Sequence, residues 1–219
     1  MTPPSAERRQ DDGIVKVTTL RGRDVRRAIP VMGRAFWAYP ESTHLLPDES
    51  RRRRVLPRYL GSDMIDAAKF GWLLGATVDG HIVGAAAWLP PSAYPIPARR
   101  QVRQLVEMVP VVPWALGAAA EARRGQHANR QHHRGRPPHF YLRAIGIDPA
   151  MQGRGIGTAL MHSVIDQADR YGVGCFLTTA TAENAAWYEH LGFSIAVQYK
   201  PTPTWPNVWA LWREPQTPN

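Results

Sequence analysis

The feature that most limits how this chain can fold is a glycine-rich turn set between an apolar strand pattern and an amphipathic helix pattern. Residues 140 to 147 read Phe-Tyr-Leu-Arg-Ala-Ile-Gly-Ile, and Asp148-Pro149 ends that strand. The turn follows as Gln152-Gly153-Arg154-Gly155-Ile156-Gly157. Beyond it, apolar residues recur at every fourth position, which predicts a helix with one apolar face. They are Ile156, Leu160, Val164 and Ala168. This order of elements predicts an α/β fold.

The turn has the chemistry of a phosphate-binding site. Glycines let the backbone bend and approach a ligand closely, and the first N–H groups of a helix attract anions. Arg154 adds a charged donor. A nucleoside-triphosphate loop is disfavoured because no lysine follows the last glycine. A dinucleotide fingerprint is disfavoured because its third glycine would fall at Thr158. The turn has the other known form of such loops, Q/R-x-x-G-x-G/A.

Other segments supply more strands and helices. The Asp79-Gly80 dipeptide lies between two apolar runs, 72–78 and 82–89, and predicts a hairpin. We expect further strands at 14–20, 173–179, 193–199 and 208–212, and helices at 24–36, 51–60, 99–108, 114–124 and 183–190. Residues 37–49 are predicted as loop. Residues 123–138, rich in Arg, His, Gly and Pro, are predicted as a solvated connection.

Two blocks in this order resemble the GNAT superfamily of N-acetyltransferases. The first is the strand, turn and helix from Ala144 to Thr158. The second, Asn184 to Phe193, resembles the family pattern N-x-x-A/P-x-x-x-Y-x-x-x-G-F with slightly tighter spacing. The likeness covers residues 139 to 199. Upstream, the runs 35–44 and 86–91 resemble the puromycin N-acetyltransferase subgroup, which would extend the likeness over most of the chain from Val17.

The resemblance implies one GNAT domain of the α/β (α+β) class. Its sheet would be mixed, mostly antiparallel and splayed at the middle, with helices on both faces. We place this domain at residues 14–213, between a mobile tail at 1–13 and a short tail at 214–219. Residues 92–138 would be a helical and loop embellishment near the acceptor entrance.

The same resemblance implies acetyl-CoA as co-substrate and no metal. In the family the turn and helix start bind the pyrophosphate, and the preceding strand pairs with the pantetheine arm. The positions of this sequence that match are Ile145, Gly146, Ile147, Gln152, Gly153, Arg154, Gly155, Ile156, Gly157, Thr158, Asn184 and Tyr188.

Acetyl transfer from a thioester to an amine requires donors for the carbonyl oxygen, a proton for the leaving thiolate and removal of a proton from the amine. By analogy with the family, Tyr188 is the acid, and a backbone N–H near Ile147 is the oxyanion donor. Asn184 would bond the pantetheine or cap its helix. Tyr39, acting through water, is the first candidate for the base. A role for Tyr39 as a hydrophobic lid residue is an equal alternative.

Other bases remain open. Glu41, His44 and Glu107 are weaker candidates, and no base is needed if the amine arrives neutral. In the puromycin enzymes an acidic residue follows Phe-Leu in the strand after the helix; here that position is Thr178. This departure weakens any transfer of their acceptor chemistry.

Composition adds limits on partners. The formal charge of +9 suits an anionic partner, whether nucleic acid, membrane surface or small anionic cofactor. No nucleic-acid-binding motif is present. The run Arg51 to Arg54 would spread around a helix as a solvated surface. The histidines at 127, 132, 133 and 139 lack a metal-site spacing and are predicted to lie in the solvated connection.

The apolar stretch 109–120 contains two prolines and is shorter than a bilayer span. With no signal-peptide pattern at the start and Cys175 as the single cysteine, we expect a cytoplasmic protein without a membrane partner, as a monomer or homodimer.

The function implied is acetylation of a primary amine. The subgroup likeness suggests a small-molecule acceptor such as an aminonucleoside or other antibiotic, and hence antibiotic resistance. Two alternatives stay open: an N-acetyltransferase acting on protein or peptide amines, and a non-catalytic acyl-CoA sensor.

Overall fold

The sheet grows from a central hairpin whose turn is set by two residues. The computed structural model describes residues 3–4, 6–10 and 13–216. Strands β3 (Trp72–Val78) and β4 (His81–Leu89) pair antiparallel through Asp79 and Gly80, which have φ of 49° and 77°. Positive φ at both turn residues matches the twist of the flanking strands. The predicted hairpin is confirmed.

Within the described residues, eight strands form one sheet in the order β1-β2-β3-β4-β5-β6-β8-β7. The other strands are β1 (Ala6–Gln10), β2 (Gly13–Thr19), β5 (His139–Ile147), β6 (Gly174–Thr179), β7 (Ser194–Tyr199) and β8 (Val208–Arg213). All neighbouring pairs are antiparallel except β5 and β6, which are parallel. The expected mixed, mostly antiparallel sheet is confirmed.

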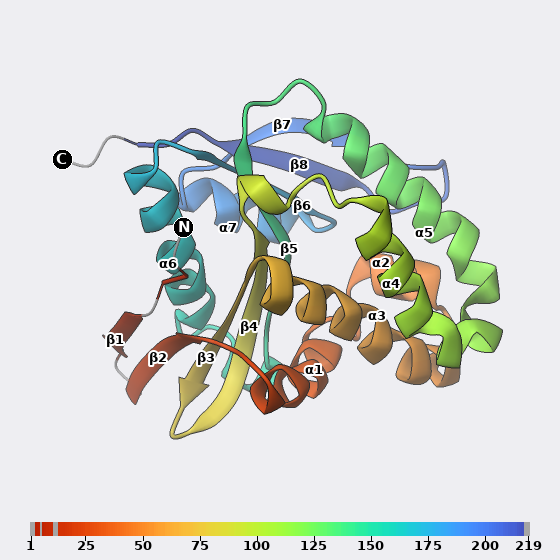
Figure 1. The fold of residues 1–219 in the computed structure, drawn as a ribbon, viewed down its shortest axis with the longest axis horizontal. Helices are drawn as coiled ribbons and strands as arrows, with labels where there is room; N and C mark the ends of the chain where they lie inside the picture. The colour runs from red at the N-terminus through yellow and green to blue at the C-terminus, as the bar shows by residue number, and fades with distance from the viewer. Residues whose placement is uncertain (1–2, 5, 11–12, 217–219) are drawn as a thin grey trace.

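Helices cover both faces of the sheet, as Figure 1 shows. One face carries α6 (Ile156–Arg170) and α7 (Ala182–His190), whose apolar residues share a core with β2 to β6. The other face carries α1 (Arg23–Ala35) and α3 (Glu49–Phe70), with α2 (Pro40–Leu45), α4 (Ala98–Met108) and α5 (Val112–His133) outside them. Short 3₁₀ turns are η1 (Pro91–Ala93), η2 (Val109–Val111) and η3 (Pro149–Met151).

The sheet splits between β5 and β6. Their pairing runs from His139 opposite Gly174 to Leu142 opposite Leu177 and then stops, although both strands continue. At the same place β5 carries one residue more than β4, because Ala87 faces Ala144 while Trp88 faces Leu142. The additional residue is Arg143. A bulge bends its strand, so it accounts for β5 diverging from β6 and for the predicted splay.

Two predictions need revision, one for the N-terminal tail and one for the helices. The mobile tail predicted at 1–13 is wrong for residues 6–10, which form β1 and pair with β2 from Ala6 opposite Val17 to Gln10 opposite Gly13. Positions 1, 2, 5, 11 and 12 of that tail lie outside the described residues. So do positions 217–219 of the predicted C-terminal tail.

The second revision concerns the helices. The loop predicted at 37–49 contains α2, and α3 continues ten residues beyond the predicted end at Leu60. The solvated connection predicted at 123–138 is helical as far as His133. Glycine suggested a loop there, but Gly125 lies inside α5 because the helix packs on Trp205: a Cβ at Gly125 would lie 2.6 Å from the indole.

Candidate active site

The glycine-rich turn presents backbone N–H groups to solvent at the start of α6. Gly153 and Gly155 have φ of 75° and 68°, a conformation that L side chains adopt only with strain. Gly155 is the N-cap of α6, and residues 152 to 155 are exposed. The N–H groups of the first turn have no carbonyl partner within the helix. These groups and the positive end of the helix dipole form a site with the chemistry to hold a diphosphate.

The end of β5 offers a free strand edge beside this turn. On one side Ile145 and Ile147 pair with β4. On the other side, within the described part of the chain, residues 143–147 have no strand partner, because β6 has diverged. Gln152 Nε2 donates to the Ile147 carbonyl at 3.2 Å and ties the turn to the strand. An amide-containing chain such as pantetheine could pair with this edge and reach the turn with its phosphates.

Helix α7 lies against the start of α6 at Gly157, where a side chain would have little room. A Cβ at Gly157 would lie 3.3 Å from the Trp187 ring. The next residue, Tyr188, is buried in the same core as Ile156. The motif residues of the two blocks, far apart in sequence, thus lie together at the split between β5 and β6.

Tyr188 is placed as a proton donor. Its side chain is 4% exposed, and burial raises the pKa of the phenol well above its ordinary value. The nearby Tyr39 raises that pKa further. A phenol with a raised pKa is protonated at neutral pH, so it has a proton to donate to the negative charge that develops on a departing sulfur.

Tyr39 is held in hydrogen bonds at the end of β6. Its hydroxyl accepts from the Ala180 N–H at 2.6 Å and lies 3.0 Å from Thr179 Oγ1. Burial, the largest effect, and the charge of Glu41 raise the pKa of Tyr39 to about 12. A phenol in these surroundings is a poor base at neutral pH, so the geometry favours a positioning role over the predicted role as base.

Asn184 is not the helix cap considered from sequence. Thr181 is the N-cap of α7, and its Oγ1 accepts the Asn184 backbone N–H at 3.2 Å. The Asn184 side chain is therefore not used in capping and lies half-buried next to the split.

A second group of side chains lies on the other side of the split. Glu41, at the start of α2, is close enough to Tyr39, Tyr59 and Tyr199 to raise the pKa of each phenol. Burial raises the pKa of the Glu41 carboxyl itself, partly offset by the Trp205 indole. The cluster of one carboxyl and several phenols comes from α1–α2, α3 and β7.

Three elements close over this cluster. Trp205, in the loop between β7 and β8, contacts α5 at Gly125, and its ring lies 5.0 Å from that of His44 in α2. Thr202 of the same loop donates to Glu121 of α5 at 3.3 Å. The side opposite the glycine-rich turn is thus enclosed by α2, α5 and the β7–β8 loop.

A buried ion pair forms the floor of this enclosed side. Arg143, the bulged residue of β5, bonds Asp63 of α3, and both side chains are almost fully buried. Asp63 in turn raises the pKa of Tyr59. These residues were not predicted from the sequence. The available signals were an arginine inside an apolar strand pattern and an Asp in the middle of a helix.

Of the weaker base candidates, His44 and Glu107 lie outside this cluster. His44 is on the wall of the enclosed side, 3.9 Å from Glu121. Glu107 is on α4 and pairs with Arg103 at 3.4 Å. Of the carboxylates considered, Glu41 alone lies among the phenols of the cluster.

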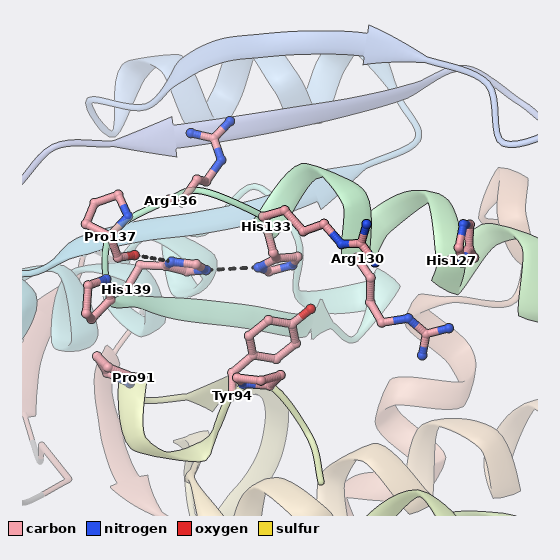
Figure 2. Close-up of a pocket in the computed structure, with 11 residues that line it drawn as sticks. Pro91, Tyr94, His127, Arg130, His133, Arg136, Pro137 and His139 are labelled. Carbon is pink, nitrogen blue, oxygen red and sulfur yellow. Dashed lines mark hydrogen bonds between the residues drawn. The ribbon is translucent and has the colours of Figure 1, made fainter. Parts of the chain in front are cut away.

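A separate cavity of about 480 Å³ lies at the opposite end of β5, far from the glycine-rich turn. Figure 2 shows His133 and His139 facing each other in it. His133 Nδ1 and His139 Nε2 are 2.9 Å apart, and His139 Nδ1 is 2.8 Å from the Pro137 carbonyl. Both histidines are buried, so the prediction that they belong to a solvated loop is wrong. Burial lowers the pKa of His133 to about 3, and it is neutral.

This cavity is not the place for acetyl transfer. β5 has nine residues from His139 to Ile147, so its two ends are about 26 Å apart. The motif residues all lie at the far end.

Comparison with known proteins decides the family. The model of the acetyltransferase (GNAT) family matches residues 34–193, well over half of the chain. The chain belongs to the GNAT acetyltransferase family. The family uses acetyl-CoA as co-substrate and acts on amines, and the prediction of a GNAT enzyme is confirmed at that level.

Individual relatives agree with this assignment. A 58-residue segment is 39% identical to an uncharacterized N-acetyltransferase of Schizosaccharomyces pombe, but the match covers 26% of this acetyltransferase and only 24% of that protein. A Corynebacterium glutamicum structure described as histone acetyltransferase HPA2 and related acetyltransferase superposes with a TM-score of 0.65 at 23% identity, covering 93% of this chain and 97% of that one. Arylalkylamine N-acetyltransferase 2 of Aedes aegypti gives 0.60 at 13%, covering 92% and 99%. The two structures establish the fold alone.

Proposed function

We propose that this protein transfers the acetyl group of acetyl-CoA to the primary amine of a small molecule. The observation that carries the proposal is the enclosure of the side opposite the glycine-rich turn by α2, α5 and the β7–β8 loop. A peptide substrate needs an open groove in which several residues can lie extended. An enclosed side lined by phenols and one carboxyl suits a compact molecule with an amine and an apolar or aromatic body.

Binding of acetyl-CoA uses the backbone of the turn and strand. The N–H groups of residues 153–158 would hold the diphosphate, with Arg154 as a charged donor. The open edge of residues 145–147 would pair with the pantetheine amides. The thioester carbonyl would then lie at the split, where a backbone N–H near Ile147 can donate to the oxygen as it gains charge.

Two side chains carry out the proton transfers of the reaction. The amine attacks the carbonyl carbon, a tetrahedral intermediate forms, and the carbon–sulfur bond breaks. Tyr188 gives its phenolic proton to the departing sulfur. Glu41 accepts a proton from the amine, directly or through water. Its raised pKa makes it a stronger base than an ordinary carboxylate, and this supports Glu41 over Tyr39, whose hydroxyl holds the end of β6 in place.

Several observations support an aromatic amine, including an aminonucleoside antibiotic, as the acceptor. Tyr59 and Tyr199 flank the carboxyl that would meet the amine. A structural neighbour is named an arylalkylamine N-acetyltransferase. One position departs from the puromycin enzymes: Thr178 stands where they have an acid. In this proposal Glu41 supplies the carboxyl from the other wall of the site.

The test is release of the CoA thiol from acetyl-CoA with a panel of amines: puromycin, an arylalkylamine, a polyamine and an unstructured peptide with a free amino terminus. We expect turnover with an aromatic amine and a large loss in Tyr188→Phe. Turnover with the peptide and with no other amine would contradict a small-molecule acceptor and would support a protein or peptide acceptor. Binding of acetyl-CoA without turnover of any amine would support the acyl-CoA sensor.

A further inference from the structure

Helix α4 is docked with its charged face inward and its apolar face outward. Arg100 is buried and donates to Asp66 of α3 through Nε at 3.1 Å, and to the Ala93 carbonyl at 2.7 Å. Arg103 also reaches Asp66, at 2.9 Å. Both guanidinium groups lie over the Phe70 ring. An amphipathic helix on a protein surface normally has the opposite orientation.

The consequence is an exposed apolar surface where α4 turns through η2 into α5. We call this surface the apolar tip. Six large aliphatic residues on it are between 40% and 69% exposed. They are Val102, Leu105, Val106, Val109, Val112 and Leu116. The buried ion pairs to Asp66 fix this orientation, because rotating α4 to bury the valines would expose Phe70 and leave Asp66 without its partners.

Basic residues of α3 border the apolar tip on one side. In Figure 1 the start of α3 lies beside the turn between α4 and α5, and Arg54 stacks on Trp114 of α5 at 5.2 Å. Arg51, Arg54 and Arg58 are exposed and recur along one side of α3. Arg52 is buried and donates to the Leu46 carbonyl at 2.7 Å, so the solvated surface predicted for the run 51–54 is wrong at this residue. Arg51, Arg54 and Arg58 form a basic border on the α3 side of the apolar tip.

We propose that the apolar tip docks on a membrane surface that contains anionic lipid. Aliphatic side chains bordered by arginines are the composition of helices that lie in the bilayer interface. By length and composition the segment Ala98–His133 could even cross a bilayer, but its inward face is fixed to α3 by ion pairs, so it lies on the surface. A second copy of the chain is less suited as the partner, because the two basic borders would face each other.

The full-length protein would be tested by sedimentation with phosphatidylcholine vesicles, with and without phosphatidylglycerol, at low and high salt. We expect binding that requires phosphatidylglycerol and weakens with salt. Leu105→Gln with Leu116→Gln should weaken it about tenfold or more. Arg51→Gln with Arg58→Gln should weaken it about fivefold for each arginine. The matched control is Ile195→Gln, on β7, which removes an exposed aliphatic side chain away from the apolar tip and should bind like the wild type.

Three outcomes would overturn the proposal. The first is no binding to either vesicle. The second is equal binding by the wild type and the Leu105→Gln, Leu116→Gln variant, which would mean that general charge alone attracts the protein. The third is a dimer in the absence of lipid that the leucine variant dissociates, which would assign the apolar tip to a second copy. Unchanged acetyl-CoA affinity in each variant shows that the fold is intact, and this test does not depend on the proposed acceptor.

Discussion

The two sides of the split sheet are built in different ways. The acetyl-CoA side consists of backbone: an open strand edge, two glycines with positive φ and the start of one helix, all within residues 143–158. The acceptor side consists of side chains from α2, α3, α5, β5 and the β7–β8 loop, brought together from across the chain. A backbone site tolerates many side-chain changes and serves one ligand, whereas a side-chain site can change its ligand without a change of fold. We therefore expect substitutions on the two sides to have different effects on acetyl-CoA affinity, catalytic rate and stability.

The largest effect should come from the residue at the junction of the two sides. Tyr188→Phe removes one hydroxyl from a buried ring, so the fold and the acetyl-CoA affinity should be preserved. Loss of a general acid should lower kcat about 10²- to 10⁴-fold. Steady-state kinetics beside an acetyl-CoA titration measure both. The exposed Tyr171→Phe serves as control. A variant that keeps full kcat would remove Tyr188 from the mechanism.

The next effect concerns stability on the acceptor side. Asp63→Asn leaves Arg143 buried without its carboxylate, and we expect a loss of about 3 to 5 kcal/mol in the free energy of unfolding. Denaturant unfolding measures it. Arg27→Gln, which breaks the exposed pair with Asp24, is the control and should change stability by less than about 1 kcal/mol. Equal effects from the two variants would show that the ion pair is not a structural floor.

Glu41→Gln should separate activity from stability. As base, the carboxyl must be ionised, so wild-type kcat/KM should fall as the pH drops through the raised pKa of Glu41. The variant should lose about 10²-fold in rate and lack that acid limb.

The Glu41→Gln variant should lose activity but gain stability at neutral pH. A carboxyl whose pKa is raised on folding favours the folded state when protonated, and that contribution is lost as the pH rises through the folded pKa. Glu41→Gln should therefore be more stable than the wild type at neutral pH, and the difference should vanish in acid. A thermal-melt series against pH tests this, and an unchanged acid limb in the rate profile would exclude Glu41 as the base.

The smallest effect should be on the backbone side. Gly153→Ala forces a side chain into positive φ at an otherwise open position, which costs about 1 to 2 kcal/mol and disturbs the N–H groups of the turn. We expect acetyl-CoA affinity to fall about tenfold with little change in kcat at saturation. Gly135→Ala is matched in φ and in open space but lies far from the turn. It should lose similar stability and keep its acetyl-CoA affinity. Equal acetyl-CoA affinities of the two variants would contradict binding of acetyl-CoA at the glycine-rich turn.

The same contrast explains what could be predicted from sequence. The hairpin at Asp79-Gly80, the strand before Asp148 and the helix after Gly155 depend on local turn chemistry and periodicity, which neighbouring residues encode. Strand β1 could not be predicted, because its polar residues pair only through β2. The extension of α5 depends on Gly125 meeting Trp205, a contact across 80 positions.

The acceptor side could not be predicted for the same reason, because its residues meet only through contacts between distant parts of the chain. Glu41 was one weak candidate among several, and nothing in its neighbours along the chain indicates that Tyr59 and Tyr199 meet it. Arg143 and Asp63 became a pair only because a bulge turned the arginine toward α3. Tyr39 seemed the better base because its sequence context resembles an enzyme subgroup, whereas its hydrogen bonds to β6 give it another role.

The central claim is that acetyl-CoA binds at the strand edge and the glycine-rich turn. It is tested most directly by backbone amide NMR of the full chain during an acetyl-CoA titration. The account predicts saturable shifts concentrated at residues 145–147, 152–158 and 184–188. Shifts concentrated instead around His133 and His139, or no saturable shifts, would contradict it.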